Sequence, residues 1–459
     1  MPQDSGTSWA QEEFGGAPLG DRRLVQRLVK IAQKLGDRPT ASIPQACGAW
    51  DQIKGAYRFF DNHRVAEDRI LAPHFRASQE RARGQAVVLA VQDTTQFDFT
   101  GHPATTGLGL TQDQEHQGLF YHPTLLLTPE KVPLGLAHQQ VWTRPPEDFG
   151  KKHRRKQRPI QDKESCKWLH SLEATARLQE HLPQVRFVNV ADREADIFDF
   201  IRLGLRLGVH LLVRAAINRR VAQPEKYLWD HLDACPVAGY HSVTVLRRPG
   251  QAARPARLAL RFSAVTLNAP RQRYREKDLS PLTVWAVYAR EEEPPAGLAP
   301  ISWMLLTTLP VTNWQEAVTT LDWYACRWPI ETFFKILKSG CRIEQLQLET
   351  GARLRRCLAV YSVVAWRVLF LTMQGRQQPD LPCDVLLEPE EWQALHCFWH
   401  HTSKPPSEPP SLREASRLIA RLGGFIGRRG DGDPGPMTIW RGLQRLQDIA
   451  LAWRLGRAP

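Results

Sequence analysis

Short apolar stretches mark the strands expected in the middle of the chain. Residues 86–91 form an uninterrupted apolar run, and 185–190 form a second strand-like segment. Such runs are typical of strands that are buried on both faces of a sheet. Two more candidates, 124–127 and 132–137, are separated by the turn-prone segment 129–131. Together they predict an antiparallel meander beside a buried strand.

The pattern then changes to a strand, a helix and a further strand. Ile197, Phe198 and Ile201 recur at helical spacing, and the next apolar run is 211–213. A meander followed by this unit predicts an α/β fold with a mixed sheet. Residues 220–305 are rich in strand-like segments such as 256–262, which alternates. We interpret them as an inserted β-rich subdomain.

Both ends of the chain are predicted to be helical. In the first 70 residues, apolar positions recur at helical spacing beside several basic residues, among which Arg23 and Arg27 are prominent. A solvated helix face has the same charges, so this pattern alone does not identify a DNA-binding domain. Helical character returns at about 314 and includes the apolar stretch 358–373, which Arg367 interrupts. A proline-rich linker at 403–410 precedes a C-terminal helical segment.

The chain length and charge narrow the classes of protein. A chain of 459 residues is expected to form two or three domains. The net charge of +13 favours a polyanionic partner such as nucleic acid, although a basic protein that is merely soluble is about as good an explanation. The eight cysteines are scattered and are expected to be reduced. We find neither a membrane span nor a secretory signal, so we expect a cytoplasmic protein.

Two aspartates follow candidate strands directly. Asp93 comes after 86–91, and Asp192 comes after 185–190. Carboxylates at the C-terminal ends of neighbouring strands can converge at one edge of a sheet and bind hard divalent ions such as Mg²⁺. The simpler alternative, that each aspartate caps the following helix or turn, is favoured by these two residues alone.

A third group of polar residues lies in the segment 324–338. At 100° per residue, Tyr324, Arg327, Glu331 and Lys338 fall within one stripe of a continuous helix. Such a stripe is usually a solvated face, but the apolar residues between these positions indicate an embedded element. Pro329 either kinks this helix or begins a new one.

These motifs resemble those of the insertion-sequence-four family of bacterial DDE transposases, and within it the transposon five group. The resemblance rests on Gln92-Asp93-Thr94-Thr95, on the segment 191–197 and on the pattern Tyr-x2-Arg-x3-Glu-x6-Lys from Tyr324 to Lys338. Shorter similarities at 19–21, 55–59 and 419–425 extend it over nearly the whole chain.

The resemblance implies a cut-and-paste transposase with an RNase H-like catalytic core. Its metal ligands would be Asp93, Asp192 and Glu331, holding two Mg²⁺ ions per site, with Mn²⁺ able to substitute. It also implies strand cleavage, hairpin formation and resolution, and strand transfer at transposon ends. The expected domains are 1–70 for DNA-end binding, 71–373 for catalysis with an insertion at about 220–305, and 374–459 for dimerisation.

The resemblance further implies contacts with double-stranded DNA, both at the inverted-repeat ends of the element and at the target. Arg327 and Lys338 would contact phosphates near the cut, and Tyr324 would help to position the strand. Arg214 matches a further active-site arginine of the family. Trp303 lies at the position of a tryptophan that stacks on a flipped base, although a core tryptophan in a strand is the preferred explanation without the resemblance.

Two alternatives to an active transposase remain at this point. One is an RNase H-like nuclease that cuts DNA without joining it, and the other is a catalytically silent DNA-end binder or inhibitor. The intact set Asp93, Asp192 and Glu331 argues against the silent protein, while the complete Tyr-Arg-Glu-Lys pattern favours the transposase. The basic run 151–156 is interpreted either as an extra DNA contact or as a solvated loop.

Overall fold

The computed structural model describes residues 8–144, 159–245, 254–270 and 279–456. The basic run 151–156 lies outside these ranges. The chain divides into two units by its internal contacts. The first, here called the sheet unit, comprises Arg83–Asp93 and His153–Trp328, and the second, the helix-rich unit, comprises Met1–Ala82, Thr94–Lys152 and Pro329–Pro459. Each unit is described by itself.

The sheet unit contains seven strands among the residues described. In spatial order they are β1 (Val87–Gln92), β6 (Arg186–Ala191), β7 (His210–Arg214), β11 (Ser302–Thr307), β10 (Leu282–Glu291), β9 (Arg254–Leu267) and β8 (Gly239–Val245). The first three are parallel to one another, and each later neighbour is antiparallel. This arrangement confirms the predicted mixed sheet.

The β-rich insertion is present, and its strands continue the central sheet. β11 pairs with β7 through Leu305 opposite Arg214 and Leu306 opposite Val213. β10 and β9 then pair over ten residues each, from Leu282 opposite Leu267 onward. The insertion therefore widens the sheet that carries the two aspartates and shares its apolar core.

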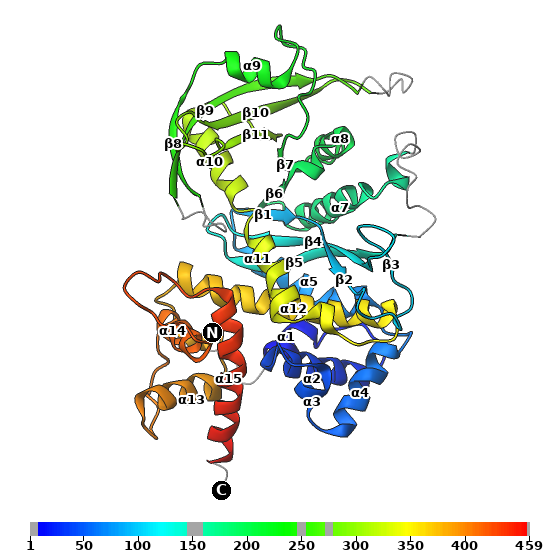
Figure 1. Ribbon diagram of the computed structural model, residues 1–459, viewed down its shortest axis with the longest axis vertical. Helices are drawn as coiled ribbons and strands as arrows, with labels where there is room; N and C mark the ends of the chain where they lie inside the picture. Colours follow the sequence, from blue (N-terminus) through cyan, green and yellow to red (C-terminus); the bar gives the residue numbers. More distant parts are fainter. Residues whose placement is uncertain (1–7, 145–158, 246–253, 271–278, 457–459) are drawn as a thin grey trace. The chain divides into compact units, whose positions relative to one another are not determined.

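Helices cover both faces of this sheet. Figure 1 shows α7 (Cys166–His181) and α8 (Phe198–Leu207) on one side of β6 and β7, and α10 (Trp314–Ala325) on the other. Trp168 of α7 and Phe200 of α8 are fully buried and meet edge to face with ring centroids 6.3 Å apart. The sheet unit thus has the layered α/β architecture of an RNase H-like core.

The helix-rich unit begins with a group of short helices. They are α1 (Trp9–Phe14), α2 (Arg22–Asp37), α3 (Ile43–Cys47), α4 (Trp50–Asp61) and α5 (Glu67–Arg83). On α2 the residues Leu28, Ile31 and Leu35 are buried, while Arg23 and Arg27 are exposed on the opposite face. The predicted basic helical segment is confirmed, and its charges lie on a solvated side.

A second antiparallel group of strands belongs to this unit. It consists of β2 (Thr95–Asp98), β3 (Gly109–Leu110), β4 (Gln117–Leu127) and β5 (Pro133–Trp142). The predicted meander is confirmed, but β4 begins seven residues before the predicted start at 124. Its early part contains His122, which is completely buried, and the hydropathy pattern does not anticipate a buried polar residue there.

The remainder of the unit is helical. It contains α11 (Pro329–Lys335), a π-helix (Ile336–Gly340), α12 (Gly351–Gln377), α13 (Pro389–His400), α14 (Leu412–Leu422) and α15 (Pro436–Leu455). Short 3₁₀ turns occupy Ile343–Gln345 and Cys383–Val385. α12 is long and apolar enough to cross a membrane, but 89% of its most apolar window is buried inside the protein. We therefore regard α12 as a core helix.

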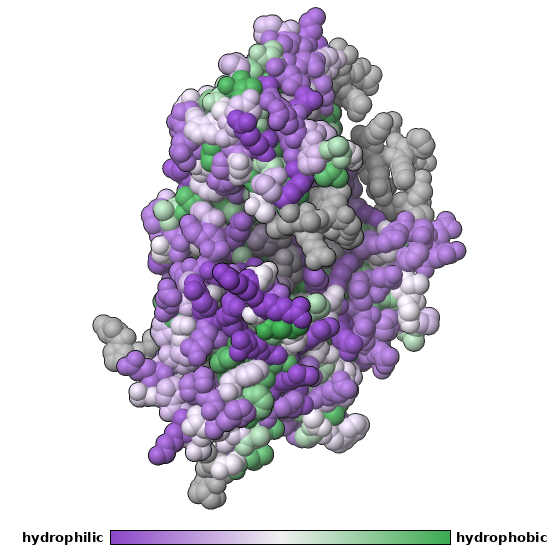
Figure 2. Space-filling model, turned by 60° about the vertical axis from the view of Figure 1, so that its left-hand side comes forward, coloured by the Kyte–Doolittle hydropathy of each residue, from purple (hydrophilic) through white to green (hydrophobic). Residues whose placement is uncertain are grey.

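The exterior is mainly hydrophilic. On the face shown in Figure 2, hydrophobic residues form small areas separated by polar ones. Trp50 at the start of α4 is 75% exposed and Phe398 on α13 is 48% exposed. Large hydrophobic side chains at the surface are thus found in both the N-terminal and the C-terminal helices.

An ionic cluster is buried where the N-terminal helices meet β5 and α12. Glu13 accepts hydrogen bonds from His74 Nδ1 at 2.5 Å and from Arg81 at 2.7 Å. His74 Nε2 accepts the backbone N–H of Leu136, so the ring is neutral and carries its proton on Nδ1. Burial opposes the charge on Glu13, but His74 and Arg81 outweigh it and lower the pKa of Glu13. Arg81 also lies 4.3 Å from the ring centre of Trp366.

A second acidic cluster lies at the end of α2. Asp37 accepts a hydrogen bond from Gln33 at 2.9 Å and has the carboxylates of Glu391 and Glu388 nearby. Burial, followed by the charge of Glu391, raises the pKa of Asp37 to about 7, although Arg367 opposes this shift. The last turn of α2 therefore holds a carboxyl group that keeps its proton until near neutral pH.

Candidate active site and DNA interface

The register of the parallel strands places three polar residues at the same edge of the sheet unit. Val91 lies opposite Val190, and Ala191 lies opposite Val213. Continuing the register by one or two residues brings Asp93, Asp192 and Arg214 to equivalent positions at the C-terminal ends of β1, β6 and β7. Ligands of open α/β sheets bind at such an edge. The prediction that both aspartates lie at one edge of the sheet is confirmed.

Buried backbone holds these positions. Residues 88–91 and 187–191 are fully buried, and Gln92 Nε2 donates a hydrogen bond to Asn189 Oδ1 at 2.9 Å across the two strands. This side-chain bond fixes the ends of β1 and β6 with respect to each other. The aspartates that follow therefore have little freedom to shift along the sheet.

Asp192 also caps the short 3₁₀ helix Arg193–Ala195. Its Oδ1 accepts the backbone N–H of Glu194 at 2.9 Å, so the capping role considered for this residue is real. Burial raises the pKa of Asp192, and the charge of Glu194 adds to this, while the hydrogen bond and Arg327 act in the opposite direction. A cation close to this carboxylate would offset the cost of burying its charge. The capping role and a ligand role are thus compatible.

Arg327 contacts Asp93 directly. Its Nη1 lies 2.9 Å from Asp93 Oδ2, and the two side chains are only 12% and 19% exposed. The same guanidinium lies 5.2 Å from the ring centre of Trp328. A charge-assisted bond between two largely buried groups fixes the orientation of the carboxylate. In the structure Arg327 therefore orients Asp93, a role that the sequence does not reveal.

Arg214, Tyr324 and Trp303 form an adjoining cluster in the sheet unit. Arg214 donates a hydrogen bond to Ser302 O at 2.9 Å, and its charge acts on the nearby Tyr324 hydroxyl. Burial lowers the pKa of Arg214 and raises that of Tyr324. The Trp303 ring lies edge to face with Tyr324, with centroids 5.5 Å apart. The structure thus brings Arg214 together with two aromatic residues that lie 89 and 110 positions later in the sequence.

Trp303 has features of both alternatives considered for it, a core tryptophan in a strand and a ring that is available to stack on a base. It lies in β11 opposite Ala289, as a core tryptophan would. However, it is only partly buried, whereas Met304, Leu305 and Leu306 after it are almost completely buried. The ring therefore retains some exposed surface at the end of the strand.

Glu331 and Lys338 belong to the helix-rich unit. α10 ends at Ala325 and α11 begins at Pro329, so the four residues do not share one continuous helix. Of the two alternatives for Pro329, the start of a new helix is confirmed. Glu331 is exposed in the first turn of α11, between the buried Ile330 and Phe333. Lys338 lies in the π-helix, where five-residue hydrogen bonding shifts the angular positions further.

Lys338 has an acidic neighbour that the sequence did not suggest. Its Nζ lies 3.7 Å from Glu344 Oε1 and 5.9 Å from the ring centre of Phe97. Glu344 Oε1 also accepts the backbone N–H of Asp98 at 3.0 Å. The carboxylate is thus anchored to the end of β2 while it faces the lysine.

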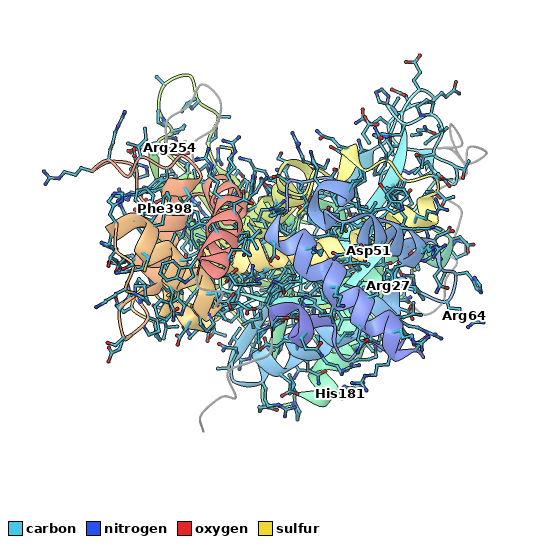
Figure 3. The ribbon with its side chains drawn as sticks, turned by 90° about the horizontal axis from the view of Figure 1, so that it is seen from below. Arg27, Asp51, Arg64, His181, Arg254 and Phe398 are labelled. Atoms are coloured by element: carbon cyan, nitrogen blue, oxygen red, sulfur yellow. The ribbon has the colours of Figure 1, made fainter. Side chains whose placement is uncertain are left out.

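The N-terminal helices present their own polar face. Figure 3 labels Arg27 on α2 and Arg64 after α4. The Arg27 side chain lies over Gly55, where an added Cβ would meet its guanidinium about 3.6 Å away. A hollow of about 460 Å³ is lined by Asp21, Arg64 and Arg69, among other residues. Two arginines and one aspartate therefore line a concave surface in this region.

Three family models match the chain in succession. Residues 6–65 match a transposase DNA-binding model, 169–363 match a transposase DDE domain, and 363–458 match a transposase Tn5 dimerisation domain. The DDE match includes Asp192 and Glu331, and Asp93 lies ahead of it on the adjacent parallel strand. The DDE domain implies dependence on divalent metal ions, and the flanking matches imply a DNA partner and a homodimer. The chain therefore belongs to the Tn5-like DDE transposases, which transfer phosphoryl groups on DNA.

Proposed function

We propose that this protein is a cut-and-paste transposase whose site is formed by Asp93, Asp192 and Glu331. The observation that carries this proposal is the equivalent placement of Asp93 and Asp192 on adjacent parallel strands, with Arg327 bonded to Asp93. Glu331 enters through its place in the Tyr-Arg-Glu-Lys pattern and the DDE match. The family assignment identifies a DDE transposase. The proposal adds the cut-and-paste reaction, including its hairpin step.

The oxygen-only donor set fits Mg²⁺, and Mn²⁺ is expected to substitute. Two ions bound by these carboxylates would activate the attacking oxygen and stabilise the leaving oxygen of each phosphoryl transfer. The raised pKa of Asp192 supports this fit, because a buried carboxylate gains most from a nearby cation. Arg327 would orient Asp93 and, together with Lys338, contact phosphates near the cut.

The proposed sequence of reactions uses one site repeatedly. Water attacks a phosphorus atom at the transposon end, and the P–O3′ bond breaks to release a 3′ hydroxyl. That hydroxyl attacks the opposite strand and forms a hairpin, which a second water opens before the same 3′ hydroxyl attacks target DNA. Each step is a phosphoryl transfer, so the same ligands serve all of them if the DNA is repositioned.

The remaining regions have proposed roles in DNA binding and assembly. Residues 1–70, with Arg23 and Arg27, would bind the inverted-repeat ends, and 374–459 would pair two protomers. The region 71–373, including the β-rich insertion at 220–305, would carry catalysis, with Arg214 and Tyr324 positioning the strand. These boundaries are supported by the ranges of the three family matches. We propose that the protein acts in the cytoplasm on DNA of the bacterial nucleoid.

The test combines a cleavage assay with a strand-transfer assay on DNA carrying the element's ends. Single Ala substitutions of Asp93, Asp192 and Glu331 should abolish Mg²⁺-dependent cleavage and leave end binding largely intact. Glu194→Gln, beside Asp192 but exposed, is the matched control and should still cleave. Cleavage without joining by the wild-type protein would identify a nuclease, and end binding without cleavage would identify an inhibitor.

A further inference from the structure

Three side chains of types that can bind metal ions meet in the C-terminal helices, away from the proposed catalytic residues. His396 and His400 lie on α13, and Glu414 lies in the first turn of α14. Their ligand atoms all lie within 4.8 Å of one another. Among the described residues, no other group of three or more His, Cys, Asp or Glu side chains meets this condition. Figure 3 labels Phe398, which lies on α13 between the two histidines.

The spacing and distances suit a single ion. Residues four apart on a helix share one face, and the two imidazole centroids are 4.2 Å apart. His400 Nε2 lies 3.8 Å from Glu414 Oε1, which is too long for a hydrogen bond. Ligand atoms on one tetrahedral ion are about 3.3 Å apart when each metal bond is about 2.0–2.1 Å. Small side-chain rotations would therefore bring the three groups onto one ion.

His396 provides an independent indication of a ligand. Its Nδ1 atom is buried and has no hydrogen-bond partner among the described residues. A buried polar atom without a partner is costly, and native structures rarely leave one unexplained. Coordination of this imidazole to a metal ion would provide the partner that the described protein groups do not.

The backbone around the cluster holds the two helices in place. α13 ends at His400, the capping residue His401 has a left-handed conformation, and the Thr402 N–H donates to Cys397 O. The proline-rich segment 403–410 then leads to α14, whose start is fixed by hydrogen bonds from Cys383 N to Pro410 O and from Leu412 N to Leu381 O. The ligands thus project from anchored helix ends, as a preformed site requires.

We propose that His396, His400 and Glu414 bind a divalent transition-metal ion such as Zn²⁺ or Co²⁺ and thereby connect α13 to α14. Two imidazoles and one carboxylate suit these ions, whereas Mg²⁺ prefers oxygen ligands alone. The site is separate from the proposed catalytic residues, because it lies within the region matched by the dimerisation model. Its ion would stabilise the C-terminal helices independently of catalysis.

The first experiment titrates the full-length protein with Co²⁺ in excess Mg²⁺ and follows the visible absorption of Co²⁺ bound to nitrogen ligands. His400→Ala and Glu414→Gln change exposed residues and should each lower the affinity on the order of 100-fold. His181→Ala, which removes an exposed histidine of α7, is the control and should bind as the wild type does. Equal affinities in all four proteins would overturn the proposal.

A second experiment separates this site from the acidic one. Asp192→Asn should keep the Co²⁺ signal, and Zn²⁺ should raise the Tm of both the wild type and Asp192→Asn but not of His400→Ala. Circular dichroism of each variant without metal checks that it is folded. Loss of the signal in Asp192→Asn together with its retention in His400→Ala would assign the ion to the catalytic carboxylates and refute the second site.

Discussion

The two regions that carry the proposed chemistry are constructed differently. Asp93, Asp192 and Arg214 follow parallel strands whose register and buried side-chain bonds fix their positions. Glu331 and Lys338 lie instead on a helix that starts at a proline and passes into a π-helix, and Lys338 is paired only loosely at 3.7 Å. A sheet edge positions its ligands rigidly, whereas an interrupted helix allows adjustment. We infer that the aspartate side is preorganised and that the lysine side responds to DNA.

The largest effect outside the proposed metal ligands is expected at Arg327. Arg327→Ala removes the 2.9 Å bond that orients Asp93 and also the proposed phosphate contact, so cleavage should fall by about 10²–10³-fold. Lys338→Ala, on the adjustable side, should lower cleavage by only about tenfold. Single-turnover cleavage rates of both variants at saturating Mg²⁺ measure the difference. A larger loss for Lys338→Ala would reverse the comparison.

Trp303 tests whether the sheet side also contributes to a later step. A flipped base could stack on the exposed part of its ring and gain ~1–3 kcal/mol. Trp303→Ala should therefore leave first-strand nicking near normal and slow hairpin formation by about tenfold or more. Time courses of nicked and hairpin products on gels measure both steps. If nicking falls as much as hairpin formation in a folded variant, Trp303 has a structural role.

Glu344→Gln tests whether Lys338, on the interrupted helix, is restrained by its acidic neighbour. Glu344→Gln removes the carboxylate that faces Lys338 while keeping an oxygen that can accept the Asp98 N–H. Release of an exposed pair worth ~0.2–1 kcal/mol should strengthen binding to DNA ends about two- to fivefold at low salt. The double variant with Lys338→Ala is the control and should show no gain. An unchanged affinity in the single variant would mean that Glu344 does not restrain the lysine.

The smallest effect on DNA cleavage is expected at Asp37, another acidic residue with a raised pKa, whose substitution should change stability instead. Because its pKa is about 7 in the folded state and near 3.8 when unfolded, the unfolded chain ionises first and the free energy of unfolding falls between about pH 4 and 7. Asp37→Asn should remove this loss and stabilise the protein by up to about 4 kcal/mol at pH 7.5, with little change at pH 4. Denaturant unfolding at both pH values tests this.

Cleavage provides the contrast for that variant. Asp37→Asn should cleave DNA normally, whereas Asp192→Asn should not, although burial raises the pKa of both residues. The difference lies in their position, because only Asp192 follows a strand of the shared edge. Loss of cleavage in a stably folded Asp37→Asn protein would show that a raised pKa identifies catalytic residues better than a position at the sheet edge does.

The sequence predicted the features that depend on local patterns. The apolar run before Asp93 and the strand-like segment before Asp192 identified β1 and β6 and their common edge, because buried parallel strands are rich in apolar residues. It did not predict that β11 would pair with β7, since strand neighbours in space are set by the whole sheet. The bond between Arg327 and Asp93 was missed for the same reason, as these residues are 234 positions apart.

Two other features depended on the path of the backbone. The stripe from Tyr324 to Lys338 assumed an uninterrupted helix, and both Pro329 and the π-helix break its periodicity. The spacing of His396 and His400 was visible in the sequence, but Glu414 joins them only because the proline-rich segment returns the chain to α13. A pattern within one helix can suggest a pair of ligands, and the fold supplies the third.

The buried ionic cluster of Glu13, His74 and Arg81 limits how such a protein can be recombined. The DNA-binding match ends at residue 65, yet Glu13 inside it accepts hydrogen bonds from His74 and from the cation Arg81, which lie beyond it. A chimera that exchanges only the matched segment could place an unpaired carboxylate in the interior, a change that typically costs 3–5 kcal/mol. An exchange of the DNA-binding segment that is meant to change the recognised DNA end should therefore include Glu13, His74 and Arg81 together, even though the matched segment ends at residue 65.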